Sequence, residues 1–192
     1  MRTATINKKT TETDINLTLN LDGTGVSNID TGIGFFDHML TLFSFHSNID
    51  LDLSCQGDLF VDDHHTVEDV GLAIASGILE ALKDKKGINR YGVSYIPMDE
   101  TLARVVIDFS GRPSFIYKVD LQQDKLGTLN TQNVQEFFKS ISNEAKINLH
   151  MEVLYGDNDH HKVEALFKAF GRAMKEAVKI IDNRLPSTKG IL

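Results

Sequence analysis

Four histidines and two glutamates of the 192-residue chain recur with the same spacing in its two halves. The run His-His-Thr-Val-Glu at 64–68 returns as His-His-Lys-Val-Glu at 160–164, an offset of 160 − 64 = 96 residues. Imidazole and carboxylate groups without thiolate are ligands for Mn, Fe, Co, Ni or Zn, and ligand softness does not choose among these metals. Two capped helices with polar first residues would need this spacing to arise twice by chance. The pattern therefore predicts metal-ligand sites.

The spacing within each copy decides which ligands can share a metal. The first histidine and the glutamate lie four residues apart and so occupy one helix face. These pairs are His64 with Glu68, and His160 with Glu164. The second histidine, His65 or His161, is turned about 100° away, so one metal cannot easily take all three. We therefore expect two metals with approximate two-fold symmetry, each held by the pair of one repeat and the second histidine of the other.

The flanking residues place these ligands in the first turn of two helices. Acidic, turn-forming residues precede both runs, Asp-Asp at 62–63 and Asp-Asn-Asp at 157–159, and are candidates for helix N-caps. An apolar run with helical spacing follows each copy. Residues 48–53 also match residues 146–151, with two extra residues before the first His-His pair. Because the match extends beyond the ligands, we expect the chain to be a duplicated half.

Hydrophobic periodicity predicts the same order of elements in both halves. In the first half we expect strands at Thr3–Lys9, at 14–22, in a short segment before residue 31, and at 49–55. We expect helices at 35–46 and 64–84, and Gly87 closes the helix at 64–84. In the second half we expect strands at 91–97, 102–109, 114–119 and 147–154, with helices at Thr131–Ala145 and 160–182. This order, βββαβα twice, predicts an α+β fold in which each half is an open, mainly antiparallel sheet with helices on one face.

Length and composition narrow the class of protein. We expect a single domain over residues 1–192, with repeats at about 1–86 and 87–184 and a polar C-terminal tail, because the metal scheme needs ligands from both halves. The chain has no apolar stretch near the roughly 20 residues that cross a bilayer and no apolar signal core, so we expect a cytoplasmic protein without a membrane partner. The net charge of −7, with dispersed Lys and Arg, argues against nucleic acid. Cys55, the single cysteine, excludes an intrachain disulfide.

Four longer motifs extend the pattern: Phe-Asp-His-Met-Leu at 36–40, Asp-Asp-His-His-Thr-Val-Glu-Asp-Val-Gly at 62–71, Ser-Gly-Arg-Pro at 110–113, and His-His-x-x-Glu-Ala-x-Phe-Lys-Ala at 160–169. With them in view, the chain resembles the imidazoleglycerol-phosphate dehydratase family of histidine biosynthesis, essentially from end to end. The resemblance implies a hydro-lyase that converts D-erythro-imidazole glycerol phosphate to imidazole acetol phosphate and water. It also implies two manganese ions (Mn²⁺) per active site and a homo-oligomer, a 24-mer with active sites between subunits.

Carried over by motif, the resemblance implies two ligand sets. One metal would take His38, His65, His160 and Glu164, and the other would take His64, Glu68, His161 and the residue that matches His38 in the second half. That residue is Glu136, since 136 − 38 = 98 equals the offset of 96 plus the two-residue gap, and a histidine is common there in the family. Glu136 could bind through oxygen, leave the metal to water, or be a solvated helix residue. A carboxylate would favour a harder ion such as Mn²⁺.

The implied reaction removes an unactivated C–H proton and expels hydroxide from the carbon attached to the imidazole ring. Two cations on the ring nitrogens would stabilise an imidazolate that helps to expel the hydroxyl group. By resemblance, Glu12 is the carboxylate placed for proton transfer, although alone it would be interpreted as an exposed turn acid. Asp108 and His46 are secondary candidates for the acid that protonates the hydroxide.

The resemblance also implies a set of substrate contacts that includes cations for the phosphate, for which the planar fork of arginine is suited. These residues are Glu12, His38, His46, His64, His65, Glu68, Arg90, Arg112, His160, Lys168, Ser187, Thr188 and Lys189.

Two other classes of protein use similar ligands. A dinuclear metallohydrolase or oxidase also pairs histidine with carboxylate, but a di-iron bundle needs four ligand helices and little sheet. A non-enzymatic metal-binding assembly protein would explain the repeat, yet it gives no purpose to Glu12, Arg90, Arg112 or the tail.

Overall fold

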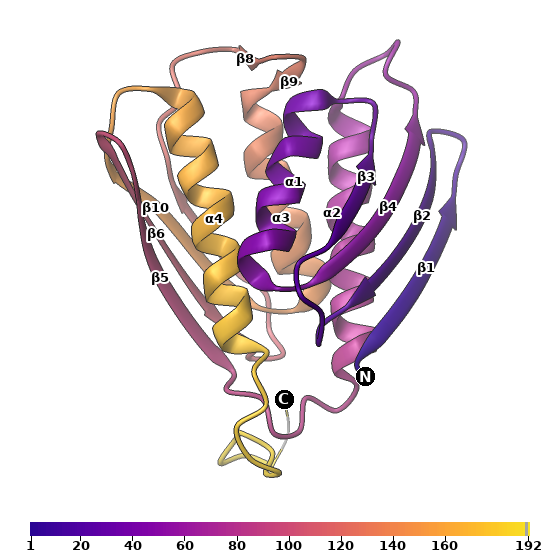
Figure 1. The fold of residues 1–192 in the computed structure, drawn as a ribbon, viewed down its shortest axis with the longest axis vertical. Helices are drawn as coiled ribbons and strands as arrows, with labels where there is room; N and C mark the ends of the chain where they lie inside the picture. Colours follow the sequence, from indigo (N-terminus) through magenta and orange to yellow (C-terminus); the bar gives the residue numbers. More distant parts are fainter. Residues whose placement is uncertain (191) are drawn as a thin grey trace.

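The computed structural model describes residues 1–190 and 192 of the chain. Within these residues, two four-stranded sheets enclose a layer of four helices, with one sheet from each half (Figure 1). The first half consists of β1 (Thr3–Lys9), β2 (Thr13–Asn20), β3 (Ser27–Asp30), α1 (Gly34–Ser47), β4 (Asp50–Gly57) and α2 (His64–Leu82). The second half consists of β5 (Tyr91–Met98), β6 (Thr101–Asp108), β7 (Ser114–Lys118), a short hairpin of β8 (Lys125–Leu126) and β9 (Leu129–Asn130), α3 (Thr131–Ala145), β10 (Asn148–Tyr155) and α4 (Asp159–Ala177).

Alternating apolar residues give each sheet one face for the helices. In β2, Ile15, Leu17 and Leu19 are buried, because side chains of a strand point to opposite faces in turn. The strand orders are β1-β2-β4-β3 and β5-β6-β10-β7. In each sheet two pairings are antiparallel and the third, β3 with β4 or β7 with β10, is parallel. The predicted α+β class, with duplicated and mainly antiparallel halves, is confirmed.

Packing between helices joins the two halves. Helix α1 contacts α4, and α2 contacts α3. Buried aromatic rings also join helices of the two halves: Phe36 of α1 meets Phe137 of α3 edge-on with centroids 5.2 Å apart, and Phe43 of α1 stacks on Phe170 of α4 at 5.2 Å. Truncating such a ring to alanine typically costs about 3–5 kcal/mol, so this cluster fixes how the helices sit. In the described part of the chain, no helix has the length and apolar character needed to cross a membrane.

The ends of two helices and one hairpin differ from the prediction. Helix α2 ends at Leu82 rather than residue 84, and α4 ends at Ala177 rather than residue 182. The backbone after α4 pairs instead with the linker between the halves, where Ile181 N donates to Gly87 O at 2.8 Å. Gly87 has φ 80°, and a Cβ there would lie 2.4 Å from Asp182 O. The hairpin β8–β9 was not predicted, because its segment lacks the alternation of a strand.

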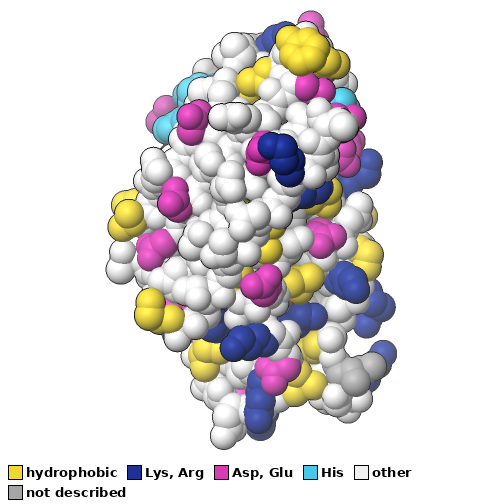
Figure 2. Space-filling model, turned by 90° about the vertical axis from the view of Figure 1, so that its right-hand side faces the viewer, with side chains coloured by type: hydrophobic (Ala, Val, Ile, Leu, Met, Phe, Trp, Pro, Cys, Tyr) yellow, Lys and Arg dark blue, Asp and Glu magenta, His cyan; other side chains and the backbone are white. Residues whose placement is uncertain are grey.

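The outer faces of the two sheets differ in polarity. One cross-strand row of the first sheet is polar and consists of Thr5, Thr18, Asp52 and Asn28. The equivalent row of the second sheet is mainly apolar and consists of Val93, Val106, His150 and Ile116. Figure 2 shows the side of the molecule that carries the first sheet, with histidines near its upper end and Lys and Arg gathered toward its lower end. His150 is exposed on the outer face of its sheet, away from the helix starts.

Candidate metal centre and phosphate contacts

All four helices begin at the same end of the helical layer, the upper end in Figure 1. The predicted metal ligands lie in the first or second turns of these helices. Asp62 Oδ1 accepts a hydrogen bond from His64 N at 2.6 Å, and Asn158 Oδ1 accepts one from His160 N at 2.9 Å. Side-chain acceptors of this kind satisfy the unpaired N–H groups of a helix start. The two acceptors therefore hold each histidine pair in the first turn of its helix.

Asp63, predicted as a possible cap of α2, instead joins α2 to α3. Its carboxylate accepts a hydrogen bond from Asn130 N at 2.7 Å and another from the Asn130 side chain. Burial alone would raise the pKa of Asp63, but these hydrogen bonds hold the pKa below its ordinary value. In the first turn of α3, Asn133 Oδ1 lies 3.2 Å from His64 Nδ1. The start of α3 therefore helps to fix the first ligand of α2.

His38, His160 and Glu164 form a compact group between α1 and α4. Glu164 Oε2 lies 3.1 Å from His160 Nε2 and 3.6 Å from His38 Nε2. One ligand atom from each residue lies within 4.8 Å of the other two. Burial would raise the pKa of Glu164, but the Lys168 ammonium, 2.6 Å from Glu164 Oε1, and His160 hold that pKa below its ordinary value. An anionic carboxylate beside two imidazoles is suited to a divalent cation.

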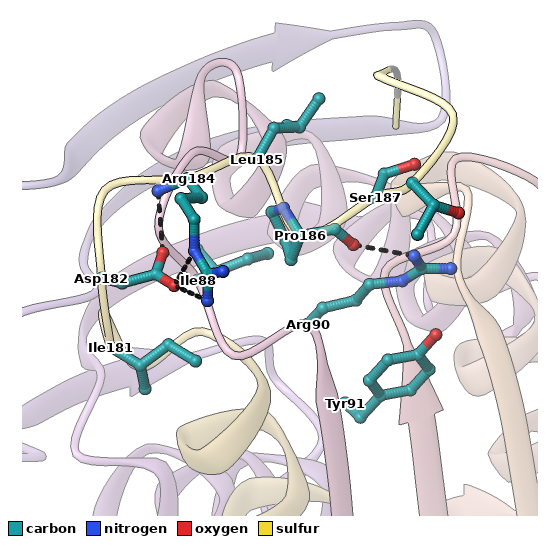
Figure 3. Close-up of a pocket in the computed structure, with 10 residues that line it drawn as sticks. Ile88, Arg90, Tyr91, Ile181, Asp182, Arg184, Leu185, Pro186 and Ser187 are labelled. Atoms are coloured by element: carbon teal, nitrogen blue, oxygen red, sulfur yellow. Dashed lines mark hydrogen bonds and ion pairs between the residues drawn. The ribbon is translucent and has the colours of Figure 1, made fainter.

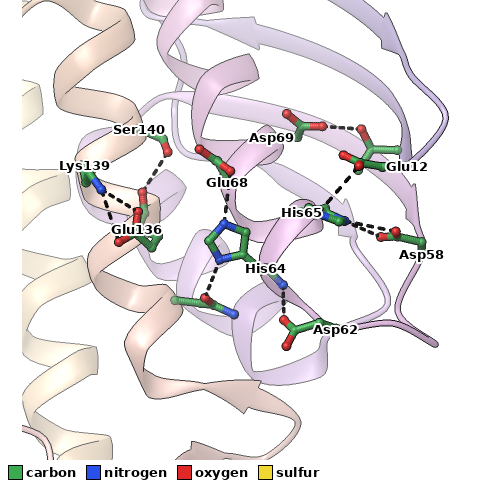
Figure 4. A network of polar contacts seen from close by, with 12 residues as sticks. Glu12, Asp58, Asp62, His64, His65, Glu68, Asp69, Glu136, Lys139 and Ser140 are labelled. Carbon is green, nitrogen blue, oxygen red and sulfur yellow. Dashed lines mark hydrogen bonds and ion pairs between the residues drawn. The ribbon is translucent and has the colours of Figure 1, made fainter.

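The equivalent group of α2 and α3 is less closely assembled (Figure 4). His64 Nε2 lies 3.3 Å from Glu68 Oε2, as their spacing predicts. The carboxylate of Glu136 is paired instead with Lys139, whose Nζ lies 3.0 Å from Oε2. Among the described residues, no ion pair or hydrogen bond joins Glu136 to His64 or Glu68. This group is therefore a pair of predicted ligands, with the carboxylate of Glu136 nearby on α3.

The second histidines point away from both groups and contact other carboxylates. His65 Nδ1 lies 3.1 Å from Asp58 Oδ2, and His161 Nδ1 lies 2.8 Å from Glu100 Oε2. The hydrogen bond to Asp58 raises the pKa of His65. Hydrogen bonds from Asn158 N and the His161 ring hold the pKa of Glu100 well below its ordinary value. One chain therefore does not bring His65 to the His38 group or His161 to the His64 group.

The sequence did not reveal Asp58, Glu100, Asn133 or Lys139 as neighbours of the ligands. The two extra residues before the first His-His pair were a signal for Asp58, because an insertion beside a ligand can add a contact. For the others, the contact depends on which elements pack together, and the spacing along the chain does not give that.

Glu12 lies in the turn between β1 and β2. Thr10 Oγ1 accepts hydrogen bonds from Glu12 N at 3.1 Å and Thr13 N at 3.0 Å, which fixes the turn. The Glu12 carboxylate is about half exposed and lies 3.8 Å from His65 Nε2, beyond hydrogen-bond distance. Glu12 is therefore held by its backbone while its carboxylate is left available.

Most of the residues predicted to contact the substrate phosphate lie at the opposite end of the molecule, around two adjoining cavities, but Lys168 lies beside Glu164 instead. Their shared lining consists of Arg90, Tyr91, Ser187 and Thr188, and Arg112 and Lys189 line the second cavity. Figure 3 shows Arg90 reaching the carbonyl oxygen of Pro186, to which Nη1 donates at 2.9 Å. Arg90 Nε donates to Asp108 Oδ1 at 2.7 Å, and this hydrogen bond raises the pKa of Arg90. The guanidinium is thus fixed at the cavity rim.

The length of α4 separates the two sets of residues. Arg90 N donates to Ala177 O at 2.9 Å, so Arg90 lies at the far end of α4 from the ligands. From Glu164 to Ala177 there are 177 − 164 = 13 residues, or about 20 Å at 1.5 Å per residue. A small phosphorylated molecule cannot contact both sets in one chain.

His46 and Lys168 lie at an intermediate level, each eight residues after a ligand histidine, since 46 − 38 and 168 − 160 both equal 8. Burial lowers the pKa of His46, and the charges of Lys168 and Arg172 lower it further. A neutral imidazole beside these cations could donate a hydrogen bond to a small molecule bound near the His38 group, or accept one from it.

Fold and site together define a class: a duplicated α+β enzyme with histidine–carboxylate groups at the helix starts and a basic end opposite them. Residues 31–174 match the family model described as imidazoleglycerol-phosphate dehydratase. The imidazoleglycerol-phosphate dehydratase of an Exiguobacterium species is 58% identical over 191 residues, which cover 99% of this chain and 98% of that protein.

Two crystal structures of the same kind of protein share the fold. The imidazoleglycerol-phosphate dehydratase of Staphylococcus aureus is 44% identical, with a TM-score of 0.85 over 93% of this chain and 99% of that one. That of Pyrococcus furiosus is 31% identical, with a TM-score of 0.82 over 97% and 100%. The chain belongs to the imidazoleglycerol-phosphate dehydratase family. It is accordingly a lyase of histidine biosynthesis, and the alternatives of a metallohydrolase or a metal-storage protein are set aside.

Proposed function

We propose that the chain dehydrates D-erythro-imidazole glycerol phosphate at sites that hold two Mn²⁺ ions and lie between subunits of a homo-oligomer. The observation that carries the proposal is the His38 group, in which two imidazoles and a buried carboxylate already lie within 4.8 Å of one another. Such a set of nitrogen and oxygen donors fits a divalent transition metal. The ions, when bound, would supply positive charge that stabilises negative charge on the imidazole ring of the substrate.

The two proposed ligand sets combine residues that one chain keeps apart. The first consists of His38, His160 and Glu164 with a His65, and the second consists of His64, Glu68 and Glu136 with a His161. Because the second histidines point away from both groups, we propose that they come from neighbouring subunits. The same reasoning applies to the phosphate contacts, which lie about 20 Å along α4 from the ligands. A homo-oligomer, a 24-mer as the resemblance implies, would bring these ends together.

Residues of the chain have separable tasks in this proposal. Arg90, held by Asp108 and by the carbonyl of Pro186, presents a pre-oriented cation to the phosphate, and Arg112 and Lys189 add charge and hydrogen-bond donors. Glu12 accepts the proton from the substrate C–H at its exposed carboxylate oxygen. The turn that holds Glu12 by Thr10 keeps this carboxylate in place while the substrate enters.

The deciding experiment follows product formation in protein of known metal content. Manganese-reconstituted protein is incubated with imidazole glycerol phosphate, and the ketone product is monitored together with bound manganese. We expect turnover that rises with metal content. Absence of product from protein with both metal positions full would overturn the proposal. Loss of turnover in both His64→Ala and His160→Ala would support a site to which both repeats contribute.

A further inference from the structure

The two outward histidines are oriented in the same way by different carboxylates. His65 Nδ1 faces Asp58 and His161 Nδ1 faces Glu100. Because an ionised carboxylate can only accept, this contact favours a hydrogen on Nδ1, which in the neutral ring leaves the lone pair on Nε2. Both side chains are partly exposed, at 33% and 23%. A carboxylate on one ring nitrogen commonly fixes the tautomer and raises the basicity of a metal-binding histidine. Both rings are therefore oriented to bind a metal through Nε2, and this metal would not be one held by the His38 or His64 group of the same chain.

The two orienting carboxylates do not occupy equivalent positions in the repeat. Strand β6 begins 101 − 13 = 88 residues after β2, so Glu100 corresponds to Glu12, since 100 − 12 = 88. Asp58 corresponds to residue 58 + 98 = 156, which is Gly156. In the first half the longer loop before α2 supplies Asp58, and in the second half the shorter loop supplies no side chain at that place.

Local geometry excludes a side chain equivalent to Asp58 from the second half. Gly156 has φ 145°, and a Cβ there would lie 2.2 Å from Thr101 Oγ1. Glu100 is instead tied to the start of α4, because its Oε1 accepts hydrogen bonds from Asn158 N at 3.0 Å and Asp157 N at 3.2 Å. Its other oxygen, Oε2, faces His161 at 2.8 Å. Both oxygens of Glu100 are therefore engaged, whereas the carboxylate of Glu12 is left available.

We propose that Glu100 is the positioning residue of His161, that Asp58 has the same task for His65, and that the presence of Asp58 in the longer loop before α2 releases Glu12 for proton transfer. This inference rests on the proposed function. The duplicated carboxylates of the two hairpin turns have thus taken different tasks, and each chain contributes one proton-transfer group rather than two.

The test compares Glu100→Ala and Glu100→Gln with the unmodified protein. In histidine-labelled, metal-free protein, ¹⁵N spectra, recorded in the solid state if the assembly is large, report the tautomer of His161, identified by its loss in His161→Gln. We expect Glu100→Ala to move the hydrogen from Nδ1 toward Nε2. Glu100→Gln keeps an acceptor oxygen and should largely retain the Nδ1–H form. Glu152→Ala, which removes a surface carboxylate of β10 paired with Arg104, is the matched control.

Manganese affinity and turnover complete the test. We expect Glu100→Ala to weaken the binding of one Mn²⁺ about 10- to 100-fold, as is usual for a residue that orients a ligand, with turnover recovering as metal is added. An unchanged tautomer and an unchanged affinity would overturn the inference. So would Glu100→Ala protein that is full of metal and yet as inactive as Glu12→Gln, because Glu100 would then act in proton transfer. Failure of the unmodified protein to bind manganese or form product would count against the proposed function, while the tautomer measurement would still stand.

Discussion

The two ligand groups lie at equivalent places in the repeat, but they differ in how completely one chain assembles them. In the group of α1 and α4, His38 reaches Glu164 at 3.6 Å. At the equivalent place on α3, Glu136 is paired with Lys139 at 3.0 Å. Lys139 itself stands where the first half has Thr41, since 139 − 41 = 98. The second group therefore has a carboxylate in place of an imidazole, and a cation that competes for this carboxylate.

The first ligands of the two groups are also held differently. His160 forms a T-shaped contact with the Phe35 ring, with centroids 5.1 Å apart, while His64 contacts the amide oxygen of Asn133 at 3.2 Å. Asn133 and Phe35 are equivalent positions, since 133 − 35 = 98. The backbones of the two halves have stayed alike while individual side chains have made the sites unequal. We therefore expect the His38 group to bind its metal first.

The largest expected effect comes from Glu164→Ala. This change removes the carboxylate that both histidines contact, and it leaves the part-buried Lys168 without its partner. We expect bound manganese to fall by one ion per site and turnover to fall below detection, as measured by metal analysis and product assay. Glu152→Ala is a suitable control. Full metal content in Glu164→Ala would contradict the assignment of the His38 group.

Glu12→Gln should give the next largest effect. Because glutamine cannot accept the proton, we expect turnover to fall about 10²- to 10⁴-fold, the usual contribution of general acid–base catalysis. Manganese content and affinity should stay unchanged, which separates Glu12 from its repeat counterpart Glu100. A parallel loss of metal from Glu12→Gln would show that the two turns have not diverged in task.

A smaller effect is expected at Glu136, which stands where the first half has His38. Glu136→Gln should weaken the second Mn²⁺ about 10-fold, at the low end of what residues around a metal typically contribute. Glu136→His should restore binding, because it repeats the chemistry of His38, and titration of metal-free protein with manganese measures both. If Glu136→Gln leaves metal content and turnover unchanged, Glu136 is not a ligand.

The smallest effect is expected for Lys139→Met, which removes the competing cation and keeps the length of the side chain. Exposed ion pairs are worth about 0.2–1 kcal/mol, so releasing Glu136 should tighten the second Mn²⁺ about 1.4- to 5-fold. Lys118→Met, a change on the strand β7, provides a control for the loss of one positive charge. Weaker binding in Lys139→Met would mean that Lys139 supports the site rather than competing with it.

The sequence predicted the fold well, because strands and helices with clear periodicity follow the same order twice. It missed the end of α4, which depends on pairing between Ile181 and Gly87 from distant parts of the chain. Within the site, the four-residue spacing predicted the contact of His64 with Glu68 and that of His160 with Glu164. It did not predict the ion pair of Glu136 with Lys139, because two i,i+3 charges on a helix can pair with each other or with a neighbouring element.

The spacing of residues along the chain could not identify the two carboxylates that orient His65 and His161. Asp58 and Glu100 lie at different distances along the chain from the histidines that they contact, so no common spacing marks them. Their contacts follow from how the hairpin turns and the loops before α2 and α4 come together. The wide separation of the predicted phosphate contacts from the predicted metal ligands likewise follows from the length of α4, and the spacing along the chain does not give it.

That separation has a consequence for inheritance. One mutant allele could encode subunits damaged at the histidine end, such as His160→Ala, and another could encode subunits damaged at Arg90. Neither allele alone would support growth without histidine under the proposed sharing of sites. In a cell that carries both, mixed assemblies would contain some sites built from one intact end of each subunit, and growth would return. Two alleles altered at the same end should fail to rescue each other.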